Sequence, residues 1–114
     1  MTRDEFLDGV RQLGEVECRP QPSGEILAIL AEQEVPGPRK QSRVAFLLPE
    51  TIAGRPTVFV DATLRTRSGG LPNNWRTQLF QSDLFGTWSF QCPWEPSGDT
   101  PATLVIAVLA QWDR

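Results

Sequence analysis

The chain has 114 residues, 39% of them hydrophobic and 22% charged, with a formal net charge of −3. This length fits a single domain with one hydrophobic core, and the negative charge gives no general attraction to nucleic acid or to anionic lipid. No apolar run reaches the roughly 18 residues of a membrane span, and the first residues lack the basic and then apolar pattern of a signal peptide. We therefore expect one cytoplasmic domain over residues 1–114 that binds neither nucleic acid nor membrane.

The chain contains no histidine and two cysteines, Cys18 and Cys92. Without histidine, Ser-His-Asp and Cys-His catalysis and histidine-based zinc hydrolysis are excluded. The two cysteines are far apart in the sequence and form no CxxC pair, so the pattern predicts neither a zinc site nor a thioredoxin-like motif. We expect no metal and no cofactor.

The first predicted element is an amphipathic helix that begins after Thr2. Thr2 and Glu5 have the spacing of a capping box, and Gly14 stands at a plausible C′ position. Apolar residues recur between them at helical spacing: Phe6, Leu7, Val10 and Leu13.

Four strands are predicted next, at residues 15–18, 25–31, 42–48 and 57–60. The run over 25–31 is also compatible with a helix, but its shortness and the Pro and Gly residues around it favour a strand. A loop is expected from Val35 to Lys40, where Pro and Gly are concentrated. Short loops between successive strands predict an antiparallel meander.

Residues 66–98 show no sustained period and are rich in Gly, Pro, Asn and Trp. An irregular stretch of this length in a compact domain is usually functional. A final helix is predicted from Pro101, with Asp99 and Thr100 as N-cap candidates. Its apolar face is expected to carry Leu104, Val105, Val108, Leu109 and Trp112. Helix, meander and helix together predict the α+β class.

This order of elements, with its Pro and Trp pattern, resembles the ubiquitin-conjugating (UBC-like) fold. More narrowly, it is similar to bacterial conjugating-enzyme-like proteins encoded beside activating enzymes and ubiquitin-like proteins. The resemblance covers roughly residues 35 to 112 and rests on Val44-Ala-Phe-Leu-Leu-Pro49, Arg55-Pro56-Thr-Val-Phe-Val60, Gly70-Leu-Pro72, Gly86-Thr-Trp88 and Trp94-Glu-Pro96.

The resemblance implies a component of a ubiquitin-like protein conjugation pathway, with the ubiquitin-like protein and its activating enzyme as partners. Such a component accepts the C-terminus of the modifier and passes it to an amine, as an acyl transferase. The alternative is a catalytically inert UBC-like adaptor that binds the modifier or the activating enzyme. A third reading is an unrelated α+β protein with a Trp-lined ligand cleft.

The resemblance also implies a role for Asn73. The family's His-Pro-Asn triplet corresponds here to Leu71-Pro72-Asn73. The family's Asn stabilises the active-site loop and the oxyanion of the tetrahedral intermediate, and the Asn73 amide keeps the donor that this role needs. The alternative is that Asn73 and Asn74 simply form a turn.

Cys92 is the nucleophile that the resemblance implies, although it is out of register. It lies nineteen residues after Asn73 and two before Trp94, whereas the family's spacing falls near Ser82. Cys92 is therefore a displaced nucleophile, a packing residue or a neighbour of the real centre. The aromatic residues around it, with no cation among them, disfavour a reactive thiolate.

Several other residues are candidates for the site. Ser82 or Ser89 could carry an oxyester in place of a thioester, although a hydroxyl needs a base. Cys18 on the first strand is expected to be a packing residue. Three carboxylates could orient or deprotonate an amine, of which Asp99 is more simply a helix cap: Asp83, Glu95 and Asp99.

Aromatic and basic residues of the irregular stretch suggest a surface for partners. Trp is enriched at interface hot spots, and the basic residues could meet an acidic partner. The alternatives are that at least two of the Trp residues belong to the core and that the basic residues are a solvated rim. The residues are Trp75, Trp88, Trp94, Arg65, Arg67 and Arg76.

Overall fold

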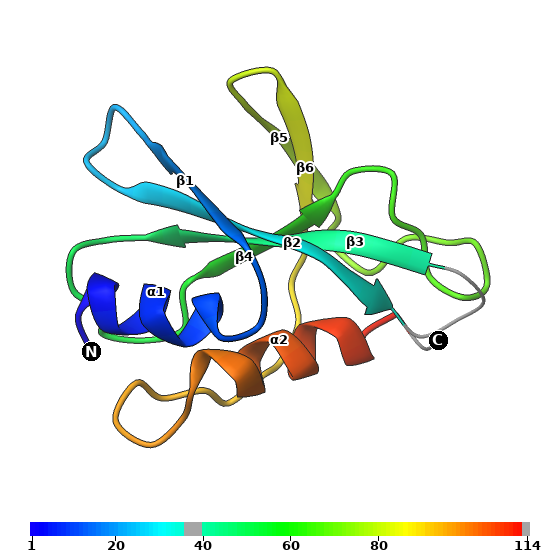
Figure 1. The fold of residues 1–114 in the computed structure, drawn as a ribbon. Helices are drawn as coiled ribbons and strands as arrows, with labels where there is room; N and C mark the ends of the chain where they lie inside the picture. Colours follow the sequence, from blue (N-terminus) through cyan, green and yellow to red (C-terminus); the bar gives the residue numbers. More distant parts are fainter. Residues whose placement is uncertain (36–39, 113–114) are drawn as a thin grey trace.

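A computed structural model describes residues 1–35 and 40–112 of the chain. The described residues form an α+β domain with two helices and one sheet (Figure 1). The elements are α1 (Arg3–Arg11), β1 (Val16–Pro20), β2 (Ile26–Val35), β3 (Lys40–Leu48), β4 (Thr57–Asp61), β5 (Arg76–Phe80), β6 (Asp83–Thr87) and α2 (Pro101–Ala110). The predicted loop after Val35 lies largely outside the described residues, and neither described helix is long and apolar enough to cross a membrane.

The sheet is antiparallel and six-stranded, in the order β1-β2-β3-β4-β6-β5. Its first four strands pair each with the next, which confirms the predicted meander between the two helices. The run over 25–31 is a strand, and β2 continues beyond it to Val35. The first part of β2 is buried on both faces, its middle is largely exposed, and its last residue, Val35, is buried again.

The expectation of an irregular stretch over 66–98 is wrong for residues 76–87. These residues form the β5–β6 hairpin, in which Phe80 pairs with Asp83 across a two-residue turn. The turn residue Gln81 has a φ of 53°, a conformation usually adopted by Gly or Asn in such turns. The sequence therefore carries no turn signal at this point, and the five-residue strands show no alternation, because apolar residues are adjacent in Leu79-Phe80 and in Leu84-Phe85.

The helix N-termini agree with the prediction, whereas the end of the first helix differs from it. Thr2 and Glu5 form the predicted capping box. Helix α1 ends at Arg11 with Gln12 as its C-cap, so Gly14 lies beyond the C′ position. Thr100 caps α2 by accepting a hydrogen bond from the Thr103 backbone N–H.

Asp99 is not the helix cap that was expected. Its carboxylate instead accepts a hydrogen bond of 2.7 Å from the backbone N–H of Glu95. It thereby closes the turn over residues 95–98, because the backbone N–H of Asp99 also donates to the Glu95 carbonyl at 2.9 Å.

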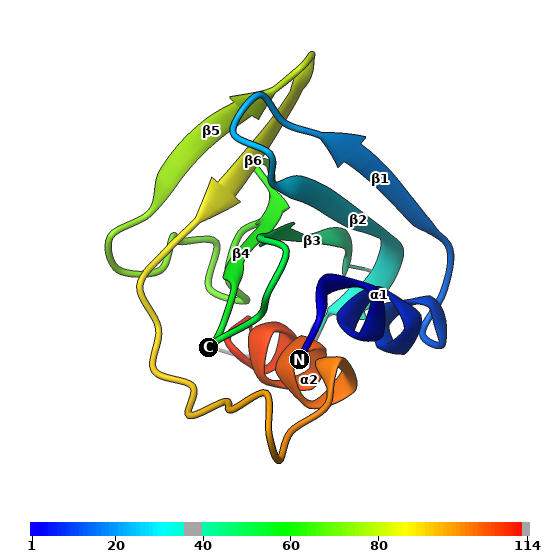
Figure 2. The ribbon, with the colours of Figure 1, turned by 90° about the vertical axis from the view of Figure 1, so that its left-hand side faces the viewer.

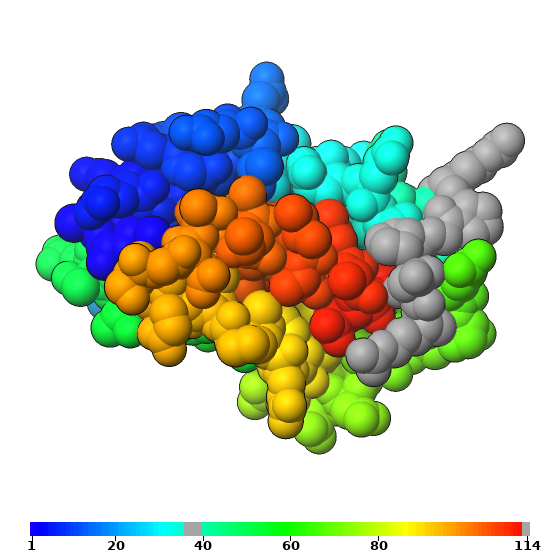
Figure 3. All heavy atoms as spheres, turned by 90° about the horizontal axis from the view of Figure 1, so that it is seen from below, coloured from blue at the N-terminus to red at the C-terminus, as the bar shows by residue number. Residues whose placement is uncertain are grey.

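The two helices lie side by side on one face of the sheet, as seen from below in Figure 3. The main core fills the space between helices and sheet, and it includes Trp88, Trp94 and Trp112. The prediction that at least two Trp residues belong to the core is thus confirmed. Trp94 is also hydrogen-bonded, since its indole N–H donates to the Thr100 carbonyl at 2.8 Å.

A second, smaller core lies on the opposite face of the sheet. The hairpin folds over this face (Figure 2) and contributes Phe80 and Phe85. These rings pack in edge contact, 6.1 Å apart, and Phe80 also meets Phe59 at 5.1 Å. The remaining members come from the meander: Leu27, Ile29 and Ala45. The hairpin is therefore held by apolar packing as well as by its pairing with β4.

Ion pairs join the turn end of the hairpin to distant strands. Asp83 accepts hydrogen bonds from Arg19 of β1 at 2.6 Å and lies 3.5 Å from Arg43 of β3. Arg43 in turn contacts Asp61 of β4 at 2.8 Å. The Arg19 guanidinium, assisted by Arg43, holds the pKa of the Asp83 carboxyl below its usual value of 3.8. The network links strands that are not neighbours in the sheet.

Replacement of Asp83 by asparagine tests this link. Because the pKa of Asp83 is lower in the folded than in the unfolded chain, its stabilising effect is complete above pH 3.8 and is lost as the pH falls through the folded-state value. We expect the melting temperature of Asp83→Asn to be a few degrees below wild type at pH 7, since the pair is partly exposed. The difference should shrink as the pH falls below 3.8 and the carboxyl becomes protonated in the folded chain.

The matched control is Asp8→Asn, which removes an exposed pair with Arg11 at 3.4 Å. It should change the melting temperature less than Asp83→Asn at neutral pH. A difference for Asp83→Asn that stays constant from pH 7 to acid would show that the ionised carboxylate does not hold the hairpin.

Candidate functional site

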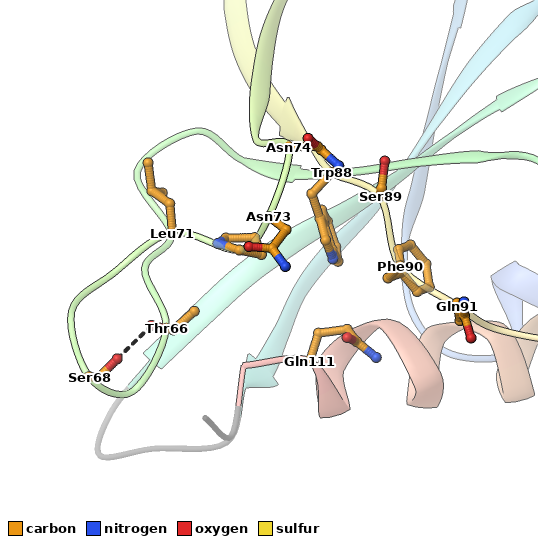
Figure 4. A pocket seen from close by; sticks show the side chains of 11 residues that line it. Thr66, Ser68, Leu71, Asn73, Asn74, Trp88, Ser89, Phe90, Gln91 and Gln111 are labelled. Carbon is orange, nitrogen blue, oxygen red and sulfur yellow. Dashed lines mark hydrogen bonds between the residues drawn. The ribbon is translucent and has the colours of Figure 1, made fainter.

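A large pocket of the described residues lies where the two strands of the hairpin join the rest of the chain (Figure 4). One wall precedes β5 and the other follows β6, and its volume is about 680 Å³. The first wall is residues 66–74, the second is residues 88–91, and Gln111 at the end of α2 closes one side. We call this cavity the amide pocket, because four of its side chains are primary amides: Asn73, Asn74, Gln91 and Gln111.

The second wall of the amide pocket is built on stacked aromatic rings. Trp88 stacks on Phe90 with ring centres 4.9 Å apart, and it also stacks on Trp75 with ring centres 6.2 Å apart. The guanidinium of Arg55 lies 4.2 Å above the Phe90 ring, within the range of a cation–π contact. The Trp112 ring packs in edge contact against the same stack, with its centre 5.0 Å from that of Trp88. Rings held on several sides form a rigid wall.

The Trp88 indole carries a hydrogen-bond donor that has no partner among the described residues. The side chain is only 6% exposed, and its Nε1 is buried without an acceptor. In Figure 4 the nitrogen-bearing edge points towards Gln111. Buried donors without acceptors are uncommon in folded proteins, so this edge of the pocket wall is polar but unsatisfied.

Asn73 lies on the first wall of the amide pocket. Its side chain points across the cavity towards Trp88 (Figure 4). Residues 73 and 74 form a turn, in which Asn74 has a φ of 58°. Asn tolerates this left-handed conformation better than most residues. The turn that the sequence offered as an alternative is thus present, and it places the Asn73 amide in the pocket.

Cys92 immediately follows the second wall but does not line the amide pocket. Along this extended segment, side chains alternate: Ser89 and Gln91 are exposed, whereas Phe90 and Cys92 are half-buried and pack against the main core. The fold therefore brings the segment that leads to Cys92 opposite Asn73, nineteen residues earlier. The thiol itself is turned towards the core.

Cys18 is exposed, which corrects the expectation that it packs in the core. The reason is its place on β1, an edge strand whose middle residues face solvent. Both cysteines are free thiols.

The two thiols should differ in reactivity towards a small alkylating reagent. We expect Cys18 to react on the order of ten times faster than Cys92 in the folded protein, because access limits alkylation of a half-buried thiol. Mass spectrometry of Cys18→Ser and Cys92→Ser separates the two sites, and each variant is the control for the other. Equal alkylation rates of the two thiols in the folded protein would contradict the inward orientation of Cys92.

The remaining sequence candidates lie apart from the amide pocket, except Ser89. Ser82 is in the hairpin turn, at the far end of five-residue strands that span about 17 Å. Asp83 follows Ser82 in the chain and forms an ion pair with Arg19. Glu95 is exposed and lies beyond Cys92 and Trp94. Of the two serines, only Ser89 contributes to the pocket.

Among the residues that the structure describes, the lining of the amide pocket contains no charged side chain. Its polar groups are the four amides and the hydroxyls of Thr66, Ser68 and Ser89. Such groups both donate and accept hydrogen bonds, and they suit an uncharged polar ligand, such as a peptide main chain. Within residues 1–35 and 40–112, no group of three or more His, Cys, Asp or Glu side chains is placed to hold a metal ion.

Several contributors to this site were not identified from the sequence, among them Gln91, Gln111 and Arg55. Gln91 and Gln111 have no motif around them, and Gln111 joins the pocket only because α2 ends beside it. Arg55 lies 35 residues before Phe90 in the chain, so their contact depends on the sheet. Gln91 could have been found from the sequence, because side chains of an extended segment alternate between two faces. Gln91 stands on the face opposite to its apolar neighbours Phe90 and Cys92.

No protein-family model, curated protein or solved structure matches this chain.

Proposed function

We propose that this chain is a cytoplasmic UBC-like component of a bacterial ubiquitin-like protein pathway, and that the amide pocket receives the C-terminal tail of the modifier. One observation carries the proposal: Asn73 and the segment that leads to Cys92 lie on opposite walls of one pocket. The element order and the Leu71-Pro72-Asn73 and Trp94-Glu-Pro96 segments support the UBC-like assignment.

The geometry favours a binding role for this pocket. Its uncharged amides and hydroxyls can pair with the N–H and C=O groups of an extended tail, while the Cys92 side chain is turned towards the core. The chain then acts as an adaptor that holds the modifier, or holds it together with the activating enzyme. The ligand forms no covalent bond with the protein in this role.

Acyl transfer through Cys92 is the second candidate, and the partial exposure of the thiol favours it. The Cys92 thiolate would attack the thioester carbonyl between modifier and activating enzyme. A new C–S bond would form at Cys92 as the old one breaks, and the thiol of the activating enzyme would leave. An amine would then displace Cys92 and form an amide, with Asn73 donating to the oxyanion.

One incubation separates these functions. The protein is mixed with the activating enzyme, ATP and the ubiquitin-like protein from the same gene neighbourhood, and is then analysed by gel filtration and by intact mass.

The binding role predicts a non-covalent complex without a mass shift. An adduct that is cleaved by DTT and is lost in Cys92→Ser, but not in Cys18→Ser, would establish transfer instead. An adduct that resists DTT but yields to hydroxylamine would point to Ser89. Neither complex nor adduct would contradict the proposal.

A further inference from the structure

The charges of this chain are unevenly distributed, and the amide pocket lies in its basic part. Residues 62–94, which supply almost the whole pocket, contain three arginines and one aspartate. The remaining residues contain eight basic and thirteen acidic side chains. The one aspartate, Asp83, is at the distant turn of the hairpin and is paired with Arg19 and Arg43. The walls of the pocket thus belong to a positive segment of an acidic protein.

Basic side chains surround the first wall of the pocket. Arg65 and Arg67 are exposed and alternate with Thr66 and Ser68, which line the cavity. Lys40 reaches the same segment, where its Nζ donates to the carbonyl oxygens of Arg65 and Thr66 at 2.8 Å each. These positive groups, which we call the basic rim, lie beside residues that line the cavity, and the lining residues that the structure describes are themselves neutral.

The positive charges of Lys40, Arg65 and Arg76 are not neutralised by carboxylates of the described residues. The guanidinium of Arg65 donates to the carbonyl oxygens of Ala62 and Leu64 at 2.9 Å. Arg76, which follows Trp75 beyond the other end of the first wall, is exposed. In the described part of the chain, neither Lys40, Arg65 nor Arg76 has an ion pair with Asp or Glu. A rim of this kind attracts an anionic partner over several ångströms.

We infer that the ligand of the amide pocket is an acidic polypeptide, with a neutral extended segment that enters the pocket and carboxylates next to it that meet the basic rim. This inference rests on the proposed function and specifies its ligand: the tail of the modifier carries Asp or Glu residues just before its neutral end. The neutral amides recognise the main chain, and the arginines select the flanking charge.

A nucleic acid fits these observations less well than a polypeptide. Single strands bind to exposed aromatic rings on which bases can stack, whereas Trp88 is only 6% exposed and already stacks on Trp75 and Phe90. The protein as a whole is also acidic, with a net charge of −3, and a long polyanion would meet that charge beyond the rim. A short acidic tail would contact the basic rim without reaching the acidic remainder of the surface.

The test compares fluorescein-labelled peptides that share a Leu-Gly-Gly end and differ before it, with an Asp/Glu, a Ser or a Lys/Arg run. Fluorescence anisotropy at low salt should show the acidic peptide binding about tenfold more tightly than the Ser peptide, which corresponds to about 1.4 kcal/mol. The difference should vanish at high salt. Arg65→Gln and Arg76→Gln should each weaken the acidic peptide about two- to fivefold, the effect of one exposed ion pair.

Arg11→Gln is the matched control, because Arg11 lies on α1 and pairs with Asp8, and it should leave the affinity unchanged. Equal binding of all three peptides would overturn the inference about charge and leave the proposed pocket function standing. Binding of none of them would contradict the proposed function as well. Tighter binding of labelled oligothymidylate than of the acidic peptide would overturn the inference in favour of a nucleic-acid ligand.

Discussion

Replacement of Trp112 by alanine should lower the free energy of unfolding by about 3–5 kcal/mol. Trp112 is fully buried, and its ring lies 5.0 Å from that of Trp88 and 6.0 Å from that of Trp75. Its loss leaves a cavity beneath the aromatic wall of the amide pocket. Because small domains are stable by about 5–15 kcal/mol in total, the variant should be close to unfolding at 25 °C. Urea titration followed by circular dichroism measures the change.

Two further variants show whether the effect comes from packing. Trp112→Phe should cost much less than Trp112→Ala, because it keeps an aromatic ring and removes an indole N–H that has no acceptor among the described residues. Ile106→Ala alters the exposed side of the same α2 helix, where the side chain is 68% exposed, and should stay within about 0.5 kcal/mol of wild type. Similar costs for Ile106→Ala and Trp112→Ala would contradict the described core.

Replacement of Gly86 by alanine should lower the free energy of unfolding by about 1–3 kcal/mol. Gly86 lies in β6, and the Trp75 indole rests directly on its backbone. A Cβ at this position would overlap Cζ2 and Cη2 of Trp75 and lie 2.8 Å from Cε2. The indole must therefore move, which separates it from Trp88 in the aromatic wall. Near-ultraviolet circular dichroism should show a weaker signal from the stacked Trp pair, alongside the shift in the urea midpoint.

Gly54→Ala is the matched control for this substitution. Gly54 has no atom within 4 Å of an added Cβ, and its φ is not in the left-handed region. Alanine should therefore be neutral there or slightly stabilising, by up to about 1 kcal/mol. If Gly86→Ala leaves both stability and the Trp signal unchanged, Trp75 does not lie on the sheet as described.

The helices and the four-stranded meander could be predicted because local signals agree with the tertiary structure. The capping box at Thr2 and Glu5 and the Pro101 start of α2 are local features. The β5–β6 hairpin could not be predicted from such signals. Its strands are stabilised by Phe80 and Phe85 packing on distant strands and by Arg19 contacting Asp83, which are long-range contacts that a local pattern does not contain.

Some residues of the candidate site were predictable from the sequence, but its orientation was not. Asn73, Ser89 and Trp88 were singled out and all line the amide pocket. The inward turn of Cys92 follows from the alternation of an extended segment whose neighbours, Trp88 and Trp94, are anchored in the core. Which side of an extended segment faces the core depends on the register of β6 against β4, and the sequence does not specify that register.

The most direct measurement is the nuclear magnetic resonance of the four indole N–H groups in ¹⁵N-labelled protein, assigned with single Trp→Phe variants, during titration with the ubiquitin-like protein. We expect the Trp88 signal to shift, because its N–H has no acceptor among the described residues and the ring lines the pocket, whereas the Trp94 signal should stay in place, since its N–H is bonded to the Thr100 carbonyl. Saturation of binding without any shift at Trp88, or with the largest shift at Trp94, would contradict the amide pocket as the site of recognition.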